Sequence, residues 1–268
     1  IKIGDLIYDD YLRFNKKPTV DYDDPKFIET VKNGYRMAIF WKDFFKQNKT
    51  DYLCYSHAVY LIGIPARISL NFNISNLNVC GDNTFRIFKN YLHQGDQFFF
   101  LKKRLLKYFE TKKNTKKFFL RKIDIEINRK MNGKIKKMDD LPFHFKKIYD
   151  PKYSKKFELE NKIAFDKKKF NILVATHDFY EGPNSEGEFI FPDYHAWIKY
   201  LLNYANKCKN KKIFWYIKPH PDFDESQFKI LKNIIPKNKN IILLPGNTPN
   251  YFLIKKGINF VLTNHGTI

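Results

Sequence analysis

Between residues 170 and 264, short apolar runs alternate with segments whose apolar residues recur at helical spacing. The runs predict strands at 170–176, 212–218, 240–246 and 258–264. The segments between them predict helices at 191–208, 224–235 and 248–257. Alternation of strands and helices is typical of a parallel sheet covered by helices. The runs are apolar at successive positions rather than at every second one, which indicates strands buried on both faces.

Each predicted strand leads into a polar segment. These segments are 176–178, 218–222, 245–248 and 264–267. In a parallel sheet all four lie at one edge, beyond the carboxyl ends of the strands, where open α/β sheets bind their ligands. Pro219 and Pro221 end the second strand, because proline lacks the N–H that a central strand needs. The alternative to a ligand site is that Lys218 and His220 belong to a rigid surface turn.

The first part of the chain has a less regular pattern. It predicts a helix at 25–47, a strand and loop at 51–57, a helix at 58–63 and a strand at 76–81. The lysine-rich stretch 98–138 carries spaced apolar residues and is typical of helix with a solvated face. Proline and charge near 150–166 favour two domains, 1–160 and 161–268.

The net charge of the chain indicates which classes of partner it could bind. Lysine and arginine number 49 against 28 acidic residues, a net charge of +21. Nucleic acid, an anionic membrane surface or a phosphorylated small molecule would each match this charge. Only seven of the basic residues are arginine. Since nucleic-acid recognition relies on arginine for bidentate contacts, nucleic acid is the disfavoured partner.

The cysteine spacing and the hydropathy of the chain indicate where in the cell the protein could lie. Cys54, Cys80 and Cys208 are widely spaced and form neither a metal-binding pattern nor a disulfide framework, which fits a reduced, cytoplasmic setting. Apolar runs stay well short of the ~20 residues of a membrane span. The lysine runs within 102–137 favour a solvated surface, or peripheral binding at the inner face of the cytoplasmic membrane.

Several motifs, in order along the chain, resemble those of bacterial surface-carbohydrate and capsule biosynthesis proteins, which are glycosyltransferases of the GT-B type. The motifs are "IGDLIYDDYLR" (3–13), "SHAVYLIGIPARISL" (56–70), "THDFYEGPNSEGEFIFPDYHAWI" (176–198), "WYIKPHPD" (215–222) and "TNHGTI" (263–268). The resemblance implies an α/β fold of two Rossmann-like domains facing across a cleft. It implies that 161–268 holds a nucleotide-sugar donor and 1–160 a glycan or lipid-linked acceptor.

The same resemblance implies a donor site. Lys218 and His220 match the family's Lys-Pro-His-Pro element, and His265, Gly266 and Thr267 match its His-Gly-Thr segment. In the family a helix with an acidic residue follows that segment, whereas this sequence ends at Ile268. The expectation is therefore a fragment with a truncated C-terminal domain and an incomplete donor site.

The residues also suggest catalytic and acceptor-side roles. Asp178 could orient the imidazole of His177, as in general acid–base pairs. Asp5 is a candidate base for the acceptor hydroxyl. Ser56 and His57 follow a predicted strand and are candidates for acceptor binding, since no Gly-X-Ser-X-Gly elbow supports a nucleophile. Ordinary loop turns and helix caps are the structural alternatives for all of them.

Together these features predict a glycosyltransferase of surface polysaccharide assembly. Its nucleotide-sugar donor is a substrate, and no metal or other cofactor is expected. A glycerol- or ribitol-phosphate transferase of the same fold is the closest alternative. A non-catalytic basic protein that binds nucleic acid or membrane is the alternative from a different class.

Overall fold

The computed structural model describes residues 2–80, 84–88, 106–107, 109–110, 113–131, 151–161, 163, 165–166, 168–185, 187 and 189–264. The chain divides into two compact units. Unit 1 comprises Ile1–Tyr108 and Phe179–Trp197, and unit 2 comprises Phe109–Asp178 and Ile198–Ile268. Each unit is described by itself below.

Unit 2 contains a four-stranded parallel sheet, which confirms the α/β prediction. Its strands are β4 (Phe170–Ala175), β5 (Ile213–Lys218), β6 (Ile241–Leu243) and β7 (Phe260–Leu262). The spatial order is β6-β5-β4-β7, and every pairing is parallel. The chain therefore builds outward from β4 to β6 and then returns to the other side of β4. This reversal of direction is the point at which doubly wound sheets bind ligands.

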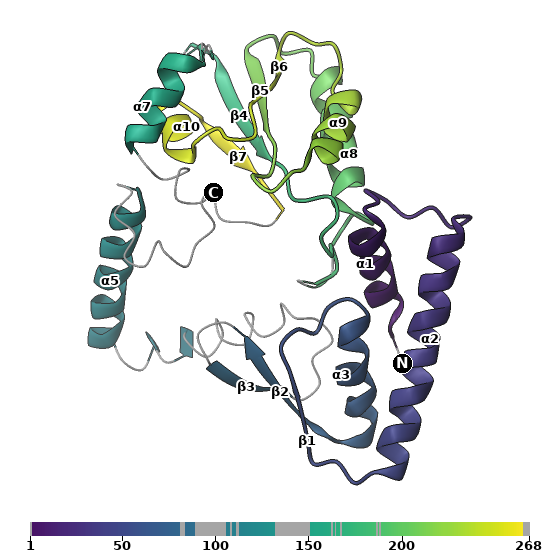
Figure 1. The fold of residues 1–268 in the computed structure, drawn as a ribbon. Helices are drawn as coiled ribbons and strands as arrows, with labels where there is room; N and C mark the ends of the chain where they lie inside the picture. Colours follow the sequence, from purple (N-terminus) through teal and green to yellow (C-terminus); the bar gives the residue numbers. More distant parts are fainter. Residues whose placement is uncertain are drawn as a thin grey trace. The chain divides into compact units, whose positions relative to one another are not determined.

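Helices cover both faces of this sheet (Figure 1). α7 (Pro151–Glu160) and α10 (Asn250–Lys256) lie on one side, and α8 (Tyr194–Lys207) and α9 (Glu225–Ile234) lie on the other. The core on the α7 and α10 side is a single apolar cluster, formed by Phe157, Leu173, Tyr216, Leu244, Phe252 and Leu253. Burial of this cluster supplies the main driving force for packing these helices on the sheet.

The helix boundaries in unit 2 follow local chemistry that the sequence revealed. The side chain of Asp224 accepts a hydrogen bond from the Gln227 N–H and caps α9. Gly257 ends α10 in the left-handed conformation, with φ of 93°, which glycine adopts at little cost. The expectation of burial on both faces fails at β7, where Phe260 is 51% exposed, because β7 lies at the edge of the sheet.

Unit 1 combines helices with a three-stranded mixed sheet. Its elements are α1 (Gly4–Asn15), α2 (Pro25–Gln47), β1 (Tyr52–Tyr55), η1 (Leu61–Gly63), α3 (Ile64–Ser69), η2 (Leu70–Phe72), β2 (Ser75–Cys80) and β3 (Thr84–Phe88). β1 and β2 are parallel, whereas β2 and β3 are antiparallel. The predicted helix at 25–47 is confirmed. The predicted helix at 58–63 is wrong, because only a 3₁₀ turn forms there and the α-helix begins at Ile64, just before Pro65 at a position where proline is tolerated.

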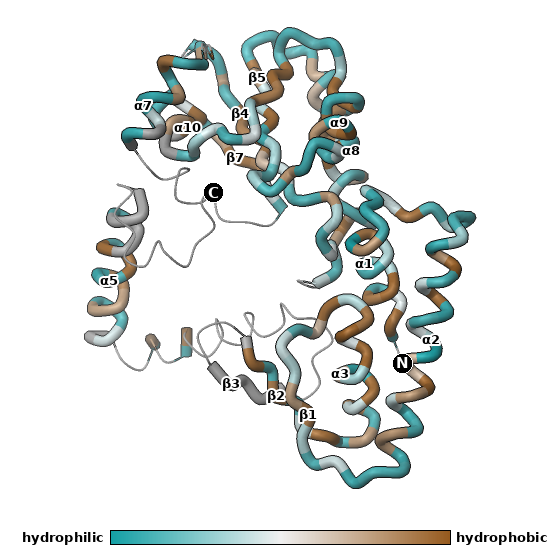
Figure 2. Tube along the Cα trace, in the orientation of Figure 1, coloured by the Kyte–Doolittle hydropathy of each residue, from teal (hydrophilic) through white to brown (hydrophobic). Residues whose placement is uncertain are grey.

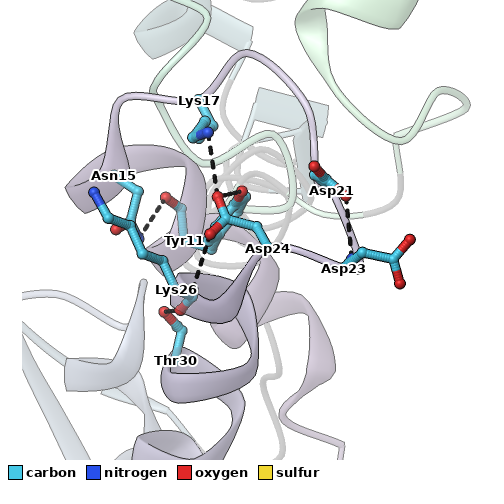
Figure 3. Close-up of polar contacts among 8 residues, drawn as sticks. All are labelled: Tyr11, Asn15, Lys17, Asp21, Asp23, Asp24, Lys26 and Thr30. Carbon is cyan, nitrogen blue, oxygen red and sulfur yellow. Dashed lines mark hydrogen bonds and ion pairs between the residues drawn. The ribbon is translucent and has the colours of Figure 1, made fainter.

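Asp24 organises the connection between α1 and α2 (Figure 3). Its carboxylate accepts a hydrogen bond from the Lys26 N–H at 2.9 Å and caps α2. It also accepts one from the Tyr11 hydroxyl at 2.8 Å and pairs with Lys17 at 3.2 Å. These donors lower the pKa of Asp24 to about 2, with the backbone hydrogen bond from Lys26 as the largest cause. The carboxylate therefore stays ionised and fixes how α2 leaves α1.

The two units do not coincide with the division expected at residue 160. α7 is in unit 2, where the rings of Phe157 and Phe252 pack 5.5 Å apart. Phe179–Trp197 is in unit 1, where its side chains form hydrogen bonds with α1. The assignment of one half to an acceptor and the other to a donor stays a prediction. Within the described residues, no helix is long and apolar enough to cross a membrane.

Candidate functional site

Thr176 joins the carboxyl ends of β4 and β5. Its N–H donates to the Lys218 carbonyl at 2.9 Å, and its hydroxyl lies 3.3 Å from that same oxygen. The hydroxyl also accepts a hydrogen bond from the His220 N–H at 3.0 Å. Thr176 is buried, and its hydroxyl contact with the Lys218 carbonyl lies away from water. These bonds fix the backbone of Lys218 and His220 relative to the end of β4.

The imidazole rings of His177 and His220 stack against each other. Their centroids are 5.4 Å apart and their planes differ by 26°. Burial lowers the pKa of His177, while a backbone hydrogen bond and the charge of Asp178 act in the opposite direction. His177 is therefore neutral near pH 7 and carries one N–H donor and one acceptor nitrogen.

The loop after β5 orients the His220 ring. The Asp222 N–H donates to Nδ1 of His220 at 3.3 Å. When the ring is neutral, this bond places its proton on Nε2, which becomes a hydrogen-bond donor. The Asp222 carboxylate lies 3.8 Å from the same Nδ1 and would stabilise a protonated ring. The two prolines thus border a loop that sets the ring's tautomer.

The side chain of Lys218 is buried, which argues against the alternative of an exposed surface turn. Lys218 is the last residue of β5 and only 5% exposed. Burial lowers the pKa of its ammonium to about 8. The group is thus a buried cation near neutral pH, and its desolvation is unfavourable. A bound anion would offset that unfavourable term.

The structure places Asp178 beside His177 but supports a different contact from the one expected. The side chain of Asp178 is buried, and Nδ1 of His177 lies 3.5 Å from the Asp178 main-chain oxygen. That distance is long for a hydrogen bond. Orientation of the imidazole by the Asp178 carboxylate stays a prediction.

Asp5 has a structural role in unit 1. Both of its oxygens accept hydrogen bonds from the guanidinium of Arg67, which is 5% exposed. Arg67 also donates to the Lys2 carbonyl at 2.8 Å, so it ties the start of the chain and α1 to α3. Both oxygens of the Asp5 carboxylate are thus engaged by one guanidinium. The acceptor-base role of Asp5 therefore gains no support.

The remaining predicted residues fall into two groups. Ser56 and His57 follow β1 in unit 1, as expected, and are exposed, with the Ser56 hydroxyl 3.0 Å from Nδ1 of His57. His265, Gly266 and Thr267 lie outside the described residues. β7 lies next to β4, with Leu262 opposite Val174.

Two features of the site were missed from the sequence. The sequence pattern places Thr176 only in a polar segment, although a hydroxyl residue at a strand end can bond to the backbone of the neighbouring strand. The burial of Lys218 was also missed, although its position directly after five apolar residues was a signal for it. Among the described residues, no group of three or more histidine, cysteine or acidic side chains could hold a metal ion.

Comparison with protein-family models, with curated proteins and with solved structures finds no match to this chain. The functional argument therefore depends on the site itself. That site consists of a buried cation and two imidazoles at the carboxyl edge of a parallel sheet. Cationic and N–H donor groups of this kind can bind an anion such as phosphate.

We predict that Thr176→Val lowers the free energy of unfolding by about 1–3 kcal/mol, because it removes a buried hydroxyl and the bond it accepts from the half-buried His220 N–H. Urea unfolding measures this change. Thr176→Ser retains the hydroxyl and is the matched control, with a smaller loss expected. A Thr176→Val protein as stable as the parent would contradict the bridging role.

Proposed function

We propose that the chain is a glycosyltransferase that binds the phosphate of a nucleotide-activated sugar at the carboxyl edge of β4 and β5. The observation that carries this proposal is the meeting of His177, Lys218 and His220 at adjacent strand ends. Lys218 and His220 come more than forty positions after His177 in the chain, and the fold brings all three to one edge. That edge lies beside the reversal in strand order, where doubly wound sheets bind nucleotides.

The electrostatics of this edge suit a phosphate leaving group. The Lys218 ammonium is buried, so its interaction with a nearby anion is stronger than it would be in water. Nε2–H of His220 and the ring of His177 add hydrogen-bonding groups at the same pair of strand ends. Groups fixed in advance around a developing negative charge stabilise the transition state without reorganising.

The proposed reaction transfers the sugar to an acceptor hydroxyl. The hydroxyl oxygen forms a bond to the anomeric carbon, and the bond from that carbon to the nucleoside diphosphate breaks. The diphosphate leaves with the bonding electrons, and a base takes the hydroxyl proton. Direct attack would invert the anomeric centre, whereas retention would need a carboxylate nucleophile on the enzyme.

The GT-B arrangement and the role in surface polysaccharide assembly belong to this proposal. The motifs that carry the resemblance support them, as does the α/β character of both units, each with parallel strand pairing. In this arrangement unit 2 would hold the nucleotide sugar and unit 1 a glycan or lipid-linked acceptor. The enzyme would work in the cytoplasm.

A glycerol- or ribitol-phosphate transferase is the second candidate. It is favoured by the same observation, since Lys218 and the two histidines recognise phosphate and show no preference for a sugar ring. Such an enzyme would move the phosphate together with its alcohol, breaking the bond between two phosphates. Incubation of the full-length protein with nucleotide sugars and with nucleotide-activated polyols separates the two candidates by which donor is consumed.

We predict that Lys218→Met and His220→Ala each lower the turnover of the donor in the full-length protein. Loss of a charge-assisted contact to the leaving phosphate should cost roughly 2–4 kcal/mol of transition-state stabilisation, or about 30- to 1000-fold in rate. Methionine preserves the buried stem of Lys218, so the fold should survive. His220→Gln should partly restore turnover if the ring only donates a hydrogen bond.

Lys212→Ala is the matched control for this experiment. Lys212 is an exposed lysine just before β5, at the opposite end of the strand from Lys218, and its removal should leave turnover unchanged. Parental turnover in both the Lys218→Met and His220→Ala proteins, at limiting and at saturating donor, would overturn the donor-site assignment.

Peripheral membrane binding is a second part of the proposal and rests on α5 (Lys113–Met131). Its exposed apolar side chains, each 43–58% accessible, are Phe118, Phe119, Leu120, Ile123 and Ile125. Lys116, Lys117, Arg121 and Lys122 lie among them and are exposed too. The alternation of hydrophobic and hydrophilic residues along α5 is visible in Figure 2. A basic helix with exposed apolar residues suits the surface of an anionic bilayer.

We predict binding to vesicles that contain phosphatidylglycerol, weakening as salt rises, and little binding to neutral phosphatidylcholine vesicles. Substitution of Lys116 and Lys117 by glutamine should weaken binding about 10- to 30-fold, at roughly 1 kcal/mol per lysine. Vesicle co-sedimentation measures the affinity. Replacing the exposed Lys209 and Lys211 by glutamine removes the same charge elsewhere and should have less effect. Equal binding to neutral vesicles would contradict this part of the proposal.

A further inference from the structure

Two buried polar side chains lie along β2, on one face of the sheet of unit 1. Asn76 is 1% exposed and Asn78 is 2% exposed. Because side chains alternate along a strand, both lie on the same face. The parallel pairing of β1 with β2 places Leu53 beside Asn76 and Tyr55 beside Asn78 on that face. Leu53 packs against the apolar cluster that includes Ile64 of α3, so this is the covered face of the sheet.

The two asparagines differ in their hydrogen bonding. The hydroxyl of Ser69, on α3, donates to Oδ1 of Asn76 at 3.0 Å. Oδ1 of Asn78 is also buried, but it has no hydrogen-bond partner within the part of the chain that the structure describes. A buried acceptor without a donor lowers the stability of the fold. A ligand that donates a hydrogen bond to Asn78 would remove that unfavourable contribution.

Tyr55 places a second polar group beside this amide. It is the last residue of β1 and the neighbour of Asn78 in the strand pairing. Burial raises the pKa of the Tyr55 hydroxyl to about 12, so the group stays neutral and can both donate and accept. Tyr55 and Asn78 thus lie together at the carboxyl end of β1, and open α/β sheets bind their ligands at that end of parallel strands.

The loop after β1 adds exposed polar groups and is held in place by close packing. Ser56 and His57 are exposed, with the Ser56 hydroxyl 3.0 Å from Nδ1 of His57. The Gly63 N–H donates to the Val59 carbonyl at 3.0 Å. A Cβ atom at position 63 would lie 2.7 Å from the carbonyl carbon of Ala58, so glycine permits this close approach. Groups that are fixed before binding lose less entropy when a ligand arrives.

Hydroxyl groups on a ligand match this set of partners. A hydroxyl can donate and accept, as the amide of Asn78 and the phenol of Tyr55 can. Two neighbouring hydroxyls of a sugar ring can donate to Oδ1 and accept from Nδ2 of one amide. β1 and β2 contain no charged residue, whereas Arg86 of β3 is opposite Asn78 in the antiparallel pairing. The shared chemistry is therefore the sugar hydroxyl, on either a neutral or an acidic ring.

We propose that Tyr55 and Asn78 form a subsite in unit 1 that binds the hydroxyl groups of a carbohydrate, with Ser56 and His57 beside it. The pairing of the two strands, the burial of Asn78 and its unpaired Oδ1 carry this inference. The subsite does not depend on the activity of unit 2. Its assignment to the acceptor of the sugar transfer rests on the proposed function.

Urea unfolding of the full chain tests whether Asn78 is kept for binding rather than for stability. Asn78→Leu removes the unpaired amide and retains a similar volume, so the midpoint should stay unchanged or rise. Asn76→Leu is the matched control on the same strand and face, and it should lower the midpoint because Ser69 loses its acceptor. A fall in Asn78→Leu as large as that in Asn76→Leu would overturn the subsite, since the amide would then have a structural partner such as a buried water.

Carbohydrate binding is measured by NMR in the full chain, with neutral maltotetraose and acidic tetragalacturonate as separate probes. At least one probe should shift the side-chain amide resonance of Asn78 along a saturable curve. The backbone resonance of Ser56 then reports the affinity of each variant. Asn78→Leu should weaken binding by about 10-fold, and Tyr55→Phe by about 3- to 10-fold. Tyr52→Phe removes an exposed hydroxyl from the other face of β1 and should leave the affinity unchanged.

Two outcomes of this titration would overturn the subsite. One is the absence of a saturable shift with either probe at tens of millimolar, and the other is parental affinity in the Asn78→Leu protein. The titration contains no nucleotide, so its result is separate from the test of the donor site. Carbohydrate binding through Asn78 in a protein that consumes no donor would retain the subsite and overturn the transferase.

Discussion

The pairing of β4 with β5 is the interaction on which the candidate site depends. The two strands are parallel and in register from Phe170 opposite Ile213 to Ala175 opposite Lys218. Their carboxyl ends are therefore level, and the residues that follow leave the sheet together. The Thr176 hydroxyl fixes this end by bonding to the backbone of the next strand. A shift of one residue would turn every side chain of a strand to the other face and would separate the two histidine rings.

Much of unit 2 could be predicted from its sequence, because its signals are local. Apolar runs and helical spacing define the strands and helices, Asp224 caps α9, and Gly257 ends α10. The position of Lys218 and His220 at a sheet edge followed from the same pattern. The burial of Lys218 did not, because it depends on what surrounds the strand end after folding.

The parts that escaped prediction depend on partners distant in sequence. Asp5 was considered as a base, but Arg67, which pairs with it, is 62 residues away. Phe179–Trp197 belongs to unit 1, where Asn184 is hydrogen-bonded to Asp9, and no local pattern indicates that contact. At 58–63, short apolar periodicity suggested a helix, whereas Pro65 favours a start one residue before it, at Ile64.

Asp5 and Asp9 show how the surroundings decide what a carboxyl group does. They are one turn apart on α1, on the same side of the helix. Asp5 forms an ion pair with Arg67, which balances its charge. Asp9 meets an amide in place of a cation, and burial raises its pKa to about 7. Two identical side chains on one helix thus have different chemistry, because one contacts a cation and the other an amide.

The central claim is that this edge binds the diphosphate of a nucleotide. The most direct test is to follow the histidine ring resonances of the full-length protein by NMR while UDP, GDP and CDP are added in turn. We expect one of the three to shift the His177 and His220 resonances together, along a single saturable curve, while His195 on α8 stays unmoved. Resonances of His177 and His220 that do not respond to any of the diphosphates at saturating concentration would contradict the account.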